Sequence, residues 1–203
     1  MKETFRMCFV LTVIGAACAA LMAFVNAQTK EPIERNAGGQ KLDAVSAVMP
    51  PSDNDVAADT LVLNDGTRDV KFHRGTKNGV PVGAAFAVVA PDGYSGDIEI
   101  LVGVDTAGAV TGLTVLKHLE TPGLGSKIET PEFRDQYLGK SVRDPETWSV
   151  AKDGGVFKQI TGATISSRAV TNAVAAGLAF FEAHKAEVLG GAPATAPSGG
   201  GGK

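Results

Sequence analysis

Residues 98–117 read IEILVGVDTAGAVTGLTVLK. Apolar side chains occupy every second position from Ile98 to Val104, which is the period of a half-buried β-strand. The residues DTAG at 105–108 are typical of a turn, and a second strand is expected over 110–116. Strands joined by so short a turn pair antiparallel, so this stretch predicts a β-hairpin within an antiparallel sheet.

The sequence before this hairpin shows the same alternation of short apolar runs and turn signals. The apolar runs are 61–63, 70–73 and 82–90, and the turn signals that follow them are NDG at 64–66, NG at 78–79 and PDG at 91–93. Adjacent strands with short turns form a meander. We therefore expect an antiparallel meander from residue 60 onwards.

The sequence after the hairpin predicts a short helix over 131–138, a short strand around 148–151 and a long helix over 164–189. The long helix carries a stripe of small and apolar residues with i,i+4 spacing, which would let it lie close to a sheet. The stripe consists of Ile165, Ala169, Ala173, Gly177 and Phe181. The predicted fold class is α+β, an antiparallel sheet packed by helices.

The N-terminal segment is uncharged from Met7 to Thr29. As a helix it would reach roughly 34 Å, enough to cross a hydrocarbon core of about 30 Å. The alternative is a cleaved signal peptide, with Lys2 and Arg6 as its basic part and Val25-Asn26-Ala27 as its cleavage site. We favour a retained transmembrane helix because the apolar run is longer than the 7–15 residues usual in a signal peptide.

This pattern divides the chain into four parts. They are 1–29, a short cytoplasmic tail and transmembrane helix; 30–59, a linker with a short helix near 40–48; 60–189, the folded domain; and 190–203, a Gly/Pro/Ala-rich tail. The tail is low in complexity and is expected to be disordered.

Composition excludes several classes of protein. The net charge is −3, so a nucleic-acid partner is not expected. Cys8 and Cys18 both lie in the apolar N-terminal segment, which leaves the folded domain without a disulfide, a zinc ribbon or a cysteine-ligated iron–sulfur cluster. His73, His118 and His184 show no ligand spacing, so we expect neither a metal site nor a catalytic triad.

The sequence TGATISS over 161–167 places a glycine turn with several hydroxyls at the start of the long helix. In one interpretation these residues only cap the helix, because Ser and Thr side chains satisfy its free N–H groups. In the other they bind an anion, since the same N–H groups and the helix dipole favour a phosphate. The residue pattern alone favours the cap.

TGATISSRAV over 161–170 resembles the flavinylation motif, Ser/Thr-Gly-Ala-Thr/Ser, of the FMN-binding subunits of the Rnf and Na⁺-translocating NADH:quinone reductase complexes. HLETPGLGSK over 118–127 follows a predicted strand and is similar to the ETPGLG segment of the same family. The N-terminal span, the meander and the last helix also match, so the resemblance runs over about 5–190. The family pattern usually has Asp six positions before the flavinylated Thr, where this sequence has Lys158.

The resemblance implies covalent FMN, with Thr164 esterified to its phosphate by a separate flavin transferase that uses FAD. It also implies that the flavin ring lies against the ETPGLG loop, where Gly123 and Gly125 leave room and Leu124 packs on the ring. The candidate cofactor-binding residues are Thr161, Gly162, Ala163, Thr164, Ile165 and Ser166 in the first motif, and Glu120, Thr121, Pro122, Gly123, Leu124 and Gly125 in the second.

The resemblance further implies a redox component of a translocase, with little activity alone. It would be an electron-transfer flavoprotein of an Rnf-type complex that links ferredoxin and NAD to ion translocation. It would lie in the cell inner membrane with other subunits, its flavin domain on the extracytoplasmic side. The alternatives are the longer homologue in the Na⁺-translocating NADH:quinone reductase, which is the C component of that enzyme, and a membrane-anchored FMN-binding sensor or regulatory module.

Overall fold

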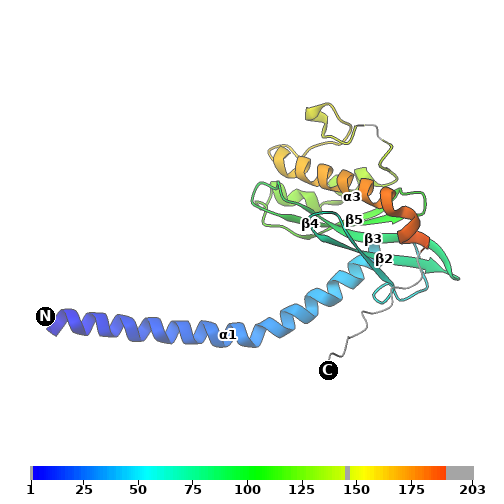
Figure 1. Cartoon of the computed structure of the whole chain (residues 1–203). Helices are drawn as coiled ribbons and strands as arrows, with labels where there is room; N and C mark the ends of the chain where they lie inside the picture. The colour runs from blue at the N-terminus through cyan, green and yellow to red at the C-terminus, as the bar shows by residue number, and fades with distance from the viewer. Residues whose placement is uncertain (1, 145–146, 191–203) are drawn as a thin grey trace, which may run out of the picture. The chain divides into compact units, whose positions relative to one another are not determined.

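The computed structural model describes residues 2–144 and 147–190 (Figure 1). Its centre is a five-stranded antiparallel sheet in the order β1-β2-β3-β4-β5. The strands are β1 (Thr60–Asn64), β2 (Asp69–Lys77), β3 (Val80–Ala90), β4 (Ile98–Asp105) and β5 (Val110–Lys117). Each strand pairs with the next one along the chain, so the predicted antiparallel meander is confirmed.

The turns of the sheet follow the turn signals in the sequence. Asn78 (φ 52°) and Gly79 (φ 75°) join β2 to β3 with torsions of the left-handed region. Asn and Gly adopt these torsions most readily, and a tight hairpin turn requires them. At 105–108 the chain turns between β4 and β5, which pair antiparallel with Leu101 opposite Thr114, so the predicted hairpin is confirmed.

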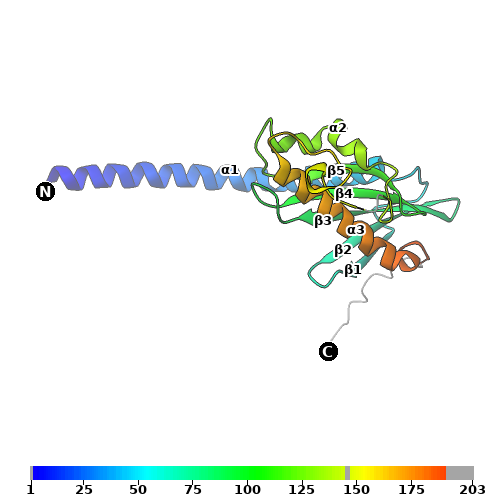
Figure 2. The same cartoon turned by 90° about the horizontal axis from the view of Figure 1, so that it is seen from above.

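The long C-terminal helix, α3 (Thr164–Gly190), lies across one face of the sheet (Figures 1 and 2). The ring of Phe181 stacks on that of Phe86 in β3, with centroids 6.1 Å apart. The helix can approach β3 because Gly177 has no side chain; a Cβ there would lie 2.4 Å from Cγ1 of Val88. This interface forms the main hydrophobic core.

The predicted helix over 164–189 is confirmed. The prediction that all five residues of its stripe face the sheet is wrong for one of them. Ala169, Gly177 and Phe181 are buried, but Ile165 is 46% exposed. In the first turn Ser166 and Ser167 are buried instead, because that end of the helix faces a polar loop and a cavity rather than the sheet. The predicted tail lies outside the described residues except for Gly190.

The chain begins with a long helix, α1 (Lys2–Val48). Among the described residues, Lys2–Thr29 is the one helical stretch long and apolar enough to cross a membrane, and none of it is buried in the protein. The chain forms two compact units, Met1–Lys41 and Leu42–Lys203. The short helix predicted near 40–48 is the last part of α1.

The end of α1 belongs to the second unit and packs on the sheet. It contributes to a second buried cluster, which consists of Val45, Val48, Met49, Ala85 and Leu101. Ala85 and Leu101 alternate along their strands with residues that face α3, so this cluster lies on the other face of the sheet. A Cβ on Gly103 would lie 2.1 Å from the Val48 carbonyl oxygen, so this glycine lets the helix end reach the sheet.

Three short helical segments follow the sheet: η1 (Gly125–Glu129), α2 (Pro131–Arg134) and η2 (Asp135–Tyr137). The last two form the short helix predicted over 131–138. Tyr137 is fully buried, and its ring stacks on Phe157 with centroids 4.7 Å apart. These segments therefore extend the core beyond the sheet.

The short strand predicted around 148–151 is wrong. Val150 makes a single bridge to Phe157, and a 3-10 helix, η3 (Ala151–Asp153), follows at once. Gly154 then reverses the chain with a φ of +84°, and no strand is present over 148–151. Trp148 packs on Phe157 as part of the core, as its apolar ring predicts.

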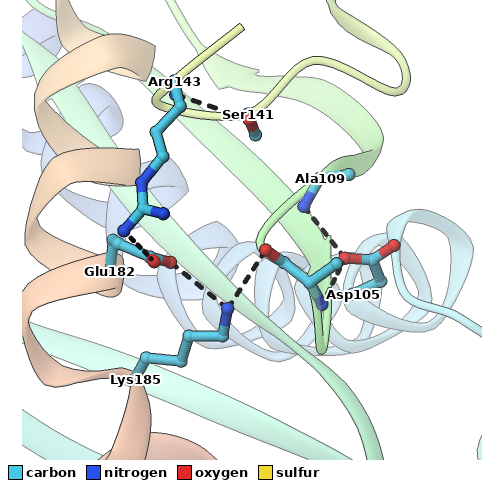
Figure 3. A network of polar contacts seen from close by, with 7 residues as sticks. Asp105, Ala109, Ser141, Arg143, Glu182 and Lys185 are labelled. Atoms are coloured by element: carbon cyan, nitrogen blue, oxygen red, sulfur yellow. Dashed lines mark hydrogen bonds and ion pairs between the residues drawn. The ribbon is translucent and has the colours of Figure 1, made fainter.

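A network of polar contacts fixes α3 to the β4–β5 turn (Figure 3). Glu182 accepts hydrogen bonds from Arg143 and from Lys185, both at 3.3 Å. Lys185 also donates to the Ala107 carbonyl at 3.1 Å, and the Ala107 N–H donates to Asp105 at 2.8 Å. This network is partly exposed, and none of its residues lines the cavity described below.

Candidate functional site

The TGAT sequence forms the turn that leads into α3. Gly162 has a φ of +83°, and the Ala163 N–H donates to the Ile160 carbonyl at 3.0 Å. The Ser167 hydroxyl closes the turn by donating to the Ala163 carbonyl at 2.9 Å and accepting from the Ile160 N–H at 3.0 Å. Thr164 is therefore the first residue of a long helix, where free N–H groups and the helix dipole favour an anion.

A cavity of about 660 Å³ opens beside this turn. Its volume is in the range usual for small-molecule sites. The lining residues are Tyr94, Glu120, Thr121, Leu124, Gly125, Lys152, Gly162, Ala163, Thr164, Ile165 and Ser166. The fold thus brings the two predicted motifs, which lie far apart in the sequence, to one space.

Three of the predicted residues do not line this cavity. Thr161 lines a smaller hollow on the other side of the turn, together with Lys158. Pro122 is exposed in the loop. Gly123 shapes the loop through a φ of +77° and through its N–H, which donates to the Ser126 hydroxyl at 2.9 Å.

Glu120 connects three segments around the cavity. Its carboxylate is buried, with the residue only 5% exposed. One oxygen accepts from the Ser166 hydroxyl at 2.6 Å, and the other accepts from the Ser95 N–H at 3.1 Å. Because both donors come from other parts of the chain, Glu120 fixes the ETPGLG loop to α3 and to the turn before β4.

The His118 ring supports Glu120 from the other side. Its Nδ1 accepts from the Glu120 N–H at 3.0 Å. The proton of a neutral ring is then on Nε2, which lies 2.9 Å from a Glu129 carboxylate oxygen and donates to it. His118 is thus a packing residue of the loop, and it also fixes the backbone of a cavity residue.

Position 125 requires glycine because the two motifs lie too close together there for a side chain. A Cβ at this position would lie 2.4 Å from Oε2 of Glu120 and 3.0 Å from the Ser166 hydroxyl. Its φ is not in the left-handed region. The place of a Cβ is therefore taken by the Glu120 side chain, while Gly125 itself lines the cavity; that it leaves room for a flavin ring stays a prediction.

Two lining residues were missed by sequence reasoning. Tyr94 lies in the turn between β3 and β4, directly before Ser95, and is 68% exposed. An exposed aromatic residue in a PDGYSG turn is a signal that could have been noticed. Lys152 follows the wrongly predicted strand, and no pattern in the sequence marks it.

The chemistry of the cavity suits a flat aromatic cofactor with a phosphate group. Tyr94, Leu124 and Ile165 offer exposed apolar surface, while Thr164 and Lys152 offer a hydroxyl and a cation. Gly162 keeps the space open, because a Cβ there would lie 3.3 Å from Leu124 Cδ2. Within 2–144 and 147–190 no group of three or more His, Cys, Asp or Glu side chains could hold a metal ion.

Family models match two parts of the chain. The FMN-binding domain matches residues 93–179, which contain both motifs and all the cavity residues. The RnfG N-terminal region matches residues 1–48, which include all of α1. An apolar N-terminal helix followed by an FMN-binding domain defines a membrane-anchored flavoprotein.

Curated relatives specify the family. The G component of the ion-translocating oxidoreductase complex of Aliivibrio fischeri (strain MJ11) is 42% identical over 191 residues, which is 89% of this chain and 91% of the relative. That of Photorhabdus laumondii is 41% identical, covering 86% and 88% of the two chains. The chain belongs to this family, the RnfG subunits of ion-translocating oxidoreductase complexes.

A solved structure shows the same fold. The crystal structure of Shewanella oneidensis NqrC matches with a TM-score of 0.50 and 21% identity, over 68% of each chain. At this identity the likeness concerns the fold alone.

Proposed function

We propose that this chain carries FMN bound covalently through Thr164 and transfers electrons within an Rnf-type complex. The chain is a membrane-anchored FMN-binding electron-transfer subunit of an ion-translocating oxidoreductase, as its family shows. The covalent bond, the twelve cofactor residues and the place in the membrane are the finer parts of the proposal.

One observation carries the proposal: Thr164 lies at the first position of α3 and at the cavity formed by both motifs. A phosphate on its oxygen would meet the free N–H groups at the start of the helix. The rest of the cofactor would then extend into the cavity, toward Leu124 and Tyr94. FMN supplies the redox chemistry when it is bound, and the protein supplies binding and tuning of the potential.

The other residues have separate roles. Gly162 gives the backbone its left-handed turn and keeps a Cβ out of the cavity. Leu124, Ile165 and Tyr94 would offer apolar surface to the ring, and Glu120 holds the loop in place. An exposed apolar rim suits electron transfer because it allows a redox partner to approach.

Attachment requires a second protein, a flavin transferase. In the described part of the chain the Thr164 hydroxyl has no hydrogen-bond partner that would act as a base, and a threonine hydroxyl is a weak nucleophile on its own. With FAD as donor, a bond forms between the Thr164 oxygen and the FMN phosphorus. The bond from that phosphorus to the AMP oxygen breaks, AMP leaves and the hydroxyl proton is released.

The relatives favour an RnfG subunit over the alternative, the NqrC-type homologue of the Na⁺-translocating quinone reductase, because they match most of the chain. The proposed location is the inner membrane, with the flavin domain on the extracytoplasmic side. The apolar helix Lys2–Thr29 supports a single-pass anchor, and a short N-terminal tail permits export of the domain.

The test is co-expression of the full-length chain with a flavin transferase. The denatured protein should fluoresce in a gel and gain the mass of one FMN less one water. Thr164→Val should abolish both signals, whereas Thr161→Val, in the same turn but outside the cavity, should keep them. Flavin that persists in Thr164→Val after denaturation would refute attachment at this residue.

A further inference from the structure

Lys152 reaches the cavity from a loop that is closed by its own backbone. The Ala151 N–H donates to the Phe157 carbonyl at 2.7 Å, and Gly154 turns the chain back with a φ of +84°. The Lys152 N–H donates to Oε1 of Gln159 at 3.3 Å. The loop over 149–157 is thus closed by hydrogen bonds between its own two ends.

A bidentate ion pair connects this loop to α3. Arg168 Nε donates to Oδ2 of Asp153 at 2.6 Å, and its Nη2 donates to Oδ1 at 2.9 Å. Arg168 lies one helical turn after Thr164, and Asp153 is the neighbour of Lys152 in the sequence. The pair therefore connects the helix end that carries the attachment residue to the loop that carries the cation.

The position of this pair indicates a role other than global stability. Both side chains are partly exposed, at 42% and 33%, and exposed ion pairs add little to the free energy of unfolding. A bidentate pair does fix geometry, because two parallel hydrogen bonds define an orientation. Hydrogen bonds from the Arg168 guanidinium lower the pKa of the Asp153 carboxyl, so the pair is ionised at neutral pH.

We propose that Arg168 and Asp153 are positioning residues, which hold Lys152 at the cavity so that its charge tunes the redox potential of the bound flavin. The inference rests on the proposed function. Neither Arg168 nor Asp153 lines the cavity, whereas Lys152 does. In the described part of the chain no salt bridge joins the Lys152 ammonium group to a carboxylate. The carboxylate of its neighbour Asp153 is paired with Arg168, and the attraction of Lys152 to it is weaker.

The expected effect follows from electrostatics. A cation beside a ring that takes up electrons stabilises the reduced form. Without the pair, the loop moves and the charge is on average farther away and better solvated. The ratio of reduced to oxidised flavin, at equilibrium with a reference dye, should then fall by about threefold or more.

The experiment is a redox titration of full-length flavinylated protein in detergent. Lys152→Met and Arg168→Gln should both lower the reduced-to-oxidised ratio. Arg168→Lys should give an intermediate value, because one of the two parallel hydrogen bonds to Asp153 is lost. The exchanged pair Asp153→Arg with Arg168→Asp should restore the wild-type ratio. Arg143→Gln is the matched control, since Arg143 also pairs with an α3 carboxylate (Figure 3) but does not line the cavity.

A second measurement does not need flavin. In full-length protein made without transferase, Arg168→Gln should raise amide hydrogen exchange over 149–157, and Arg143→Gln should not. Unchanged exchange in Arg168→Gln would overturn the proposal whether or not flavin attaches. So would an unchanged potential in Arg168→Gln, or an equal shift in Arg143→Gln. Wild-type protein that gains no flavin would instead refute the proposed function.

Discussion

The Ser166 hydroxyl donates a 2.6 Å hydrogen bond to the Glu120 carboxylate, between residues 46 positions apart in the sequence. Both groups are buried. A buried carboxylate is stable only where donors replace its lost water, and the Ser95 N–H supplies a second donor. Hydrogen bonds to Glu120 therefore join three of the four segments that line the cavity, and Lys152 belongs to the fourth.

Ser166→Ala tests this contact. The variant leaves a buried carboxylate oxygen without its donor, and hydrogen bonds to charged groups contribute about 1.5–3 kcal/mol. The free energy of unfolding, measured by urea denaturation of the full-length protein in detergent, should fall by about that amount. Ser126→Ala is the control, because its hydroxyl accepts from Gly123 in an exposed part of the same loop. Equal losses in the two variants would contradict the assignment.

Gly125→Val and Gly123→Val should differ. A side chain at Gly125 collides with Glu120, so the variant should displace the carboxylate and shift the flavin potential. At Gly123 nothing lies within 4 Å of a Cβ, and the cost is the positive φ, on the order of 1 kcal/mol. Redox titration of both flavinylated variants checks this. A potential unchanged in Gly125→Val would show that Glu120 does not control the site.

Gly103→Ala should loosen the end of α1 from the sheet. The added Cβ would meet the Val48 carbonyl oxygen, which is backbone and cannot rotate away. Overpacking of this kind costs about 1–3 kcal/mol. Thr111→Val is a milder variant of the same contact, because it removes only the hydrogen bond from Thr111 to Val48. The midpoint of thermal unfolding should therefore fall more for Gly103→Ala than for Thr111→Val.

Tyr137→Phe should show a pH-dependent loss of stability. The Tyr137 hydroxyl donates to Thr171 at 2.7 Å in the core, and its removal should cost about 0.5–1.5 kcal/mol at pH 7. Burial raises the pKa of Tyr137 above its ordinary value of 10.0. Tyrosines of the unfolded chain therefore ionise first, and this residue's contribution declines above pH 10.

Urea denaturation at pH 7 and above pH 10 checks this prediction. The difference between wild type and Tyr137→Phe should shrink at the higher pH. Other ionising groups affect both proteins equally and cancel in the comparison. A difference that grows above pH 10 would contradict a raised pKa.

The orientation of the flavin domain can be tested with one exposed position. Val62 in β1 is exposed, and Val62→Cys should react with a membrane-impermeant maleimide in cells whose outer envelope has been made permeable. Cys8→Ser and Cys18→Ser remove the two native thiols of the apolar helix. Labelling only after disruption of the inner membrane would place the domain in the cytoplasm.

Patterns of neighbouring residues in the sequence predicted only part of the site. The residue pattern over 161–164 predicts the glycine turn and the helix start, which are local features. That this motif and the ETPGLG loop belong to one cofactor site came from the resemblance to FMN-binding subunits. Tyr94 and Lys152 were missed because each is a single residue in a turn, brought to the cavity by contacts such as that of Glu120 with Ser95.

By itself, the sequence determined the meander, the long helix α3 and the apolar span, because period and turn chemistry are properties of neighbouring residues. Only the tertiary structure decided which groups meet. It buried Ser166 instead of Ile165, filled the space beside Gly125 with the Glu120 side chain, and placed Val48 against Gly103. Such contacts join residues far apart in the chain. They are determined by close packing, which the local periodicity of a sequence does not predict.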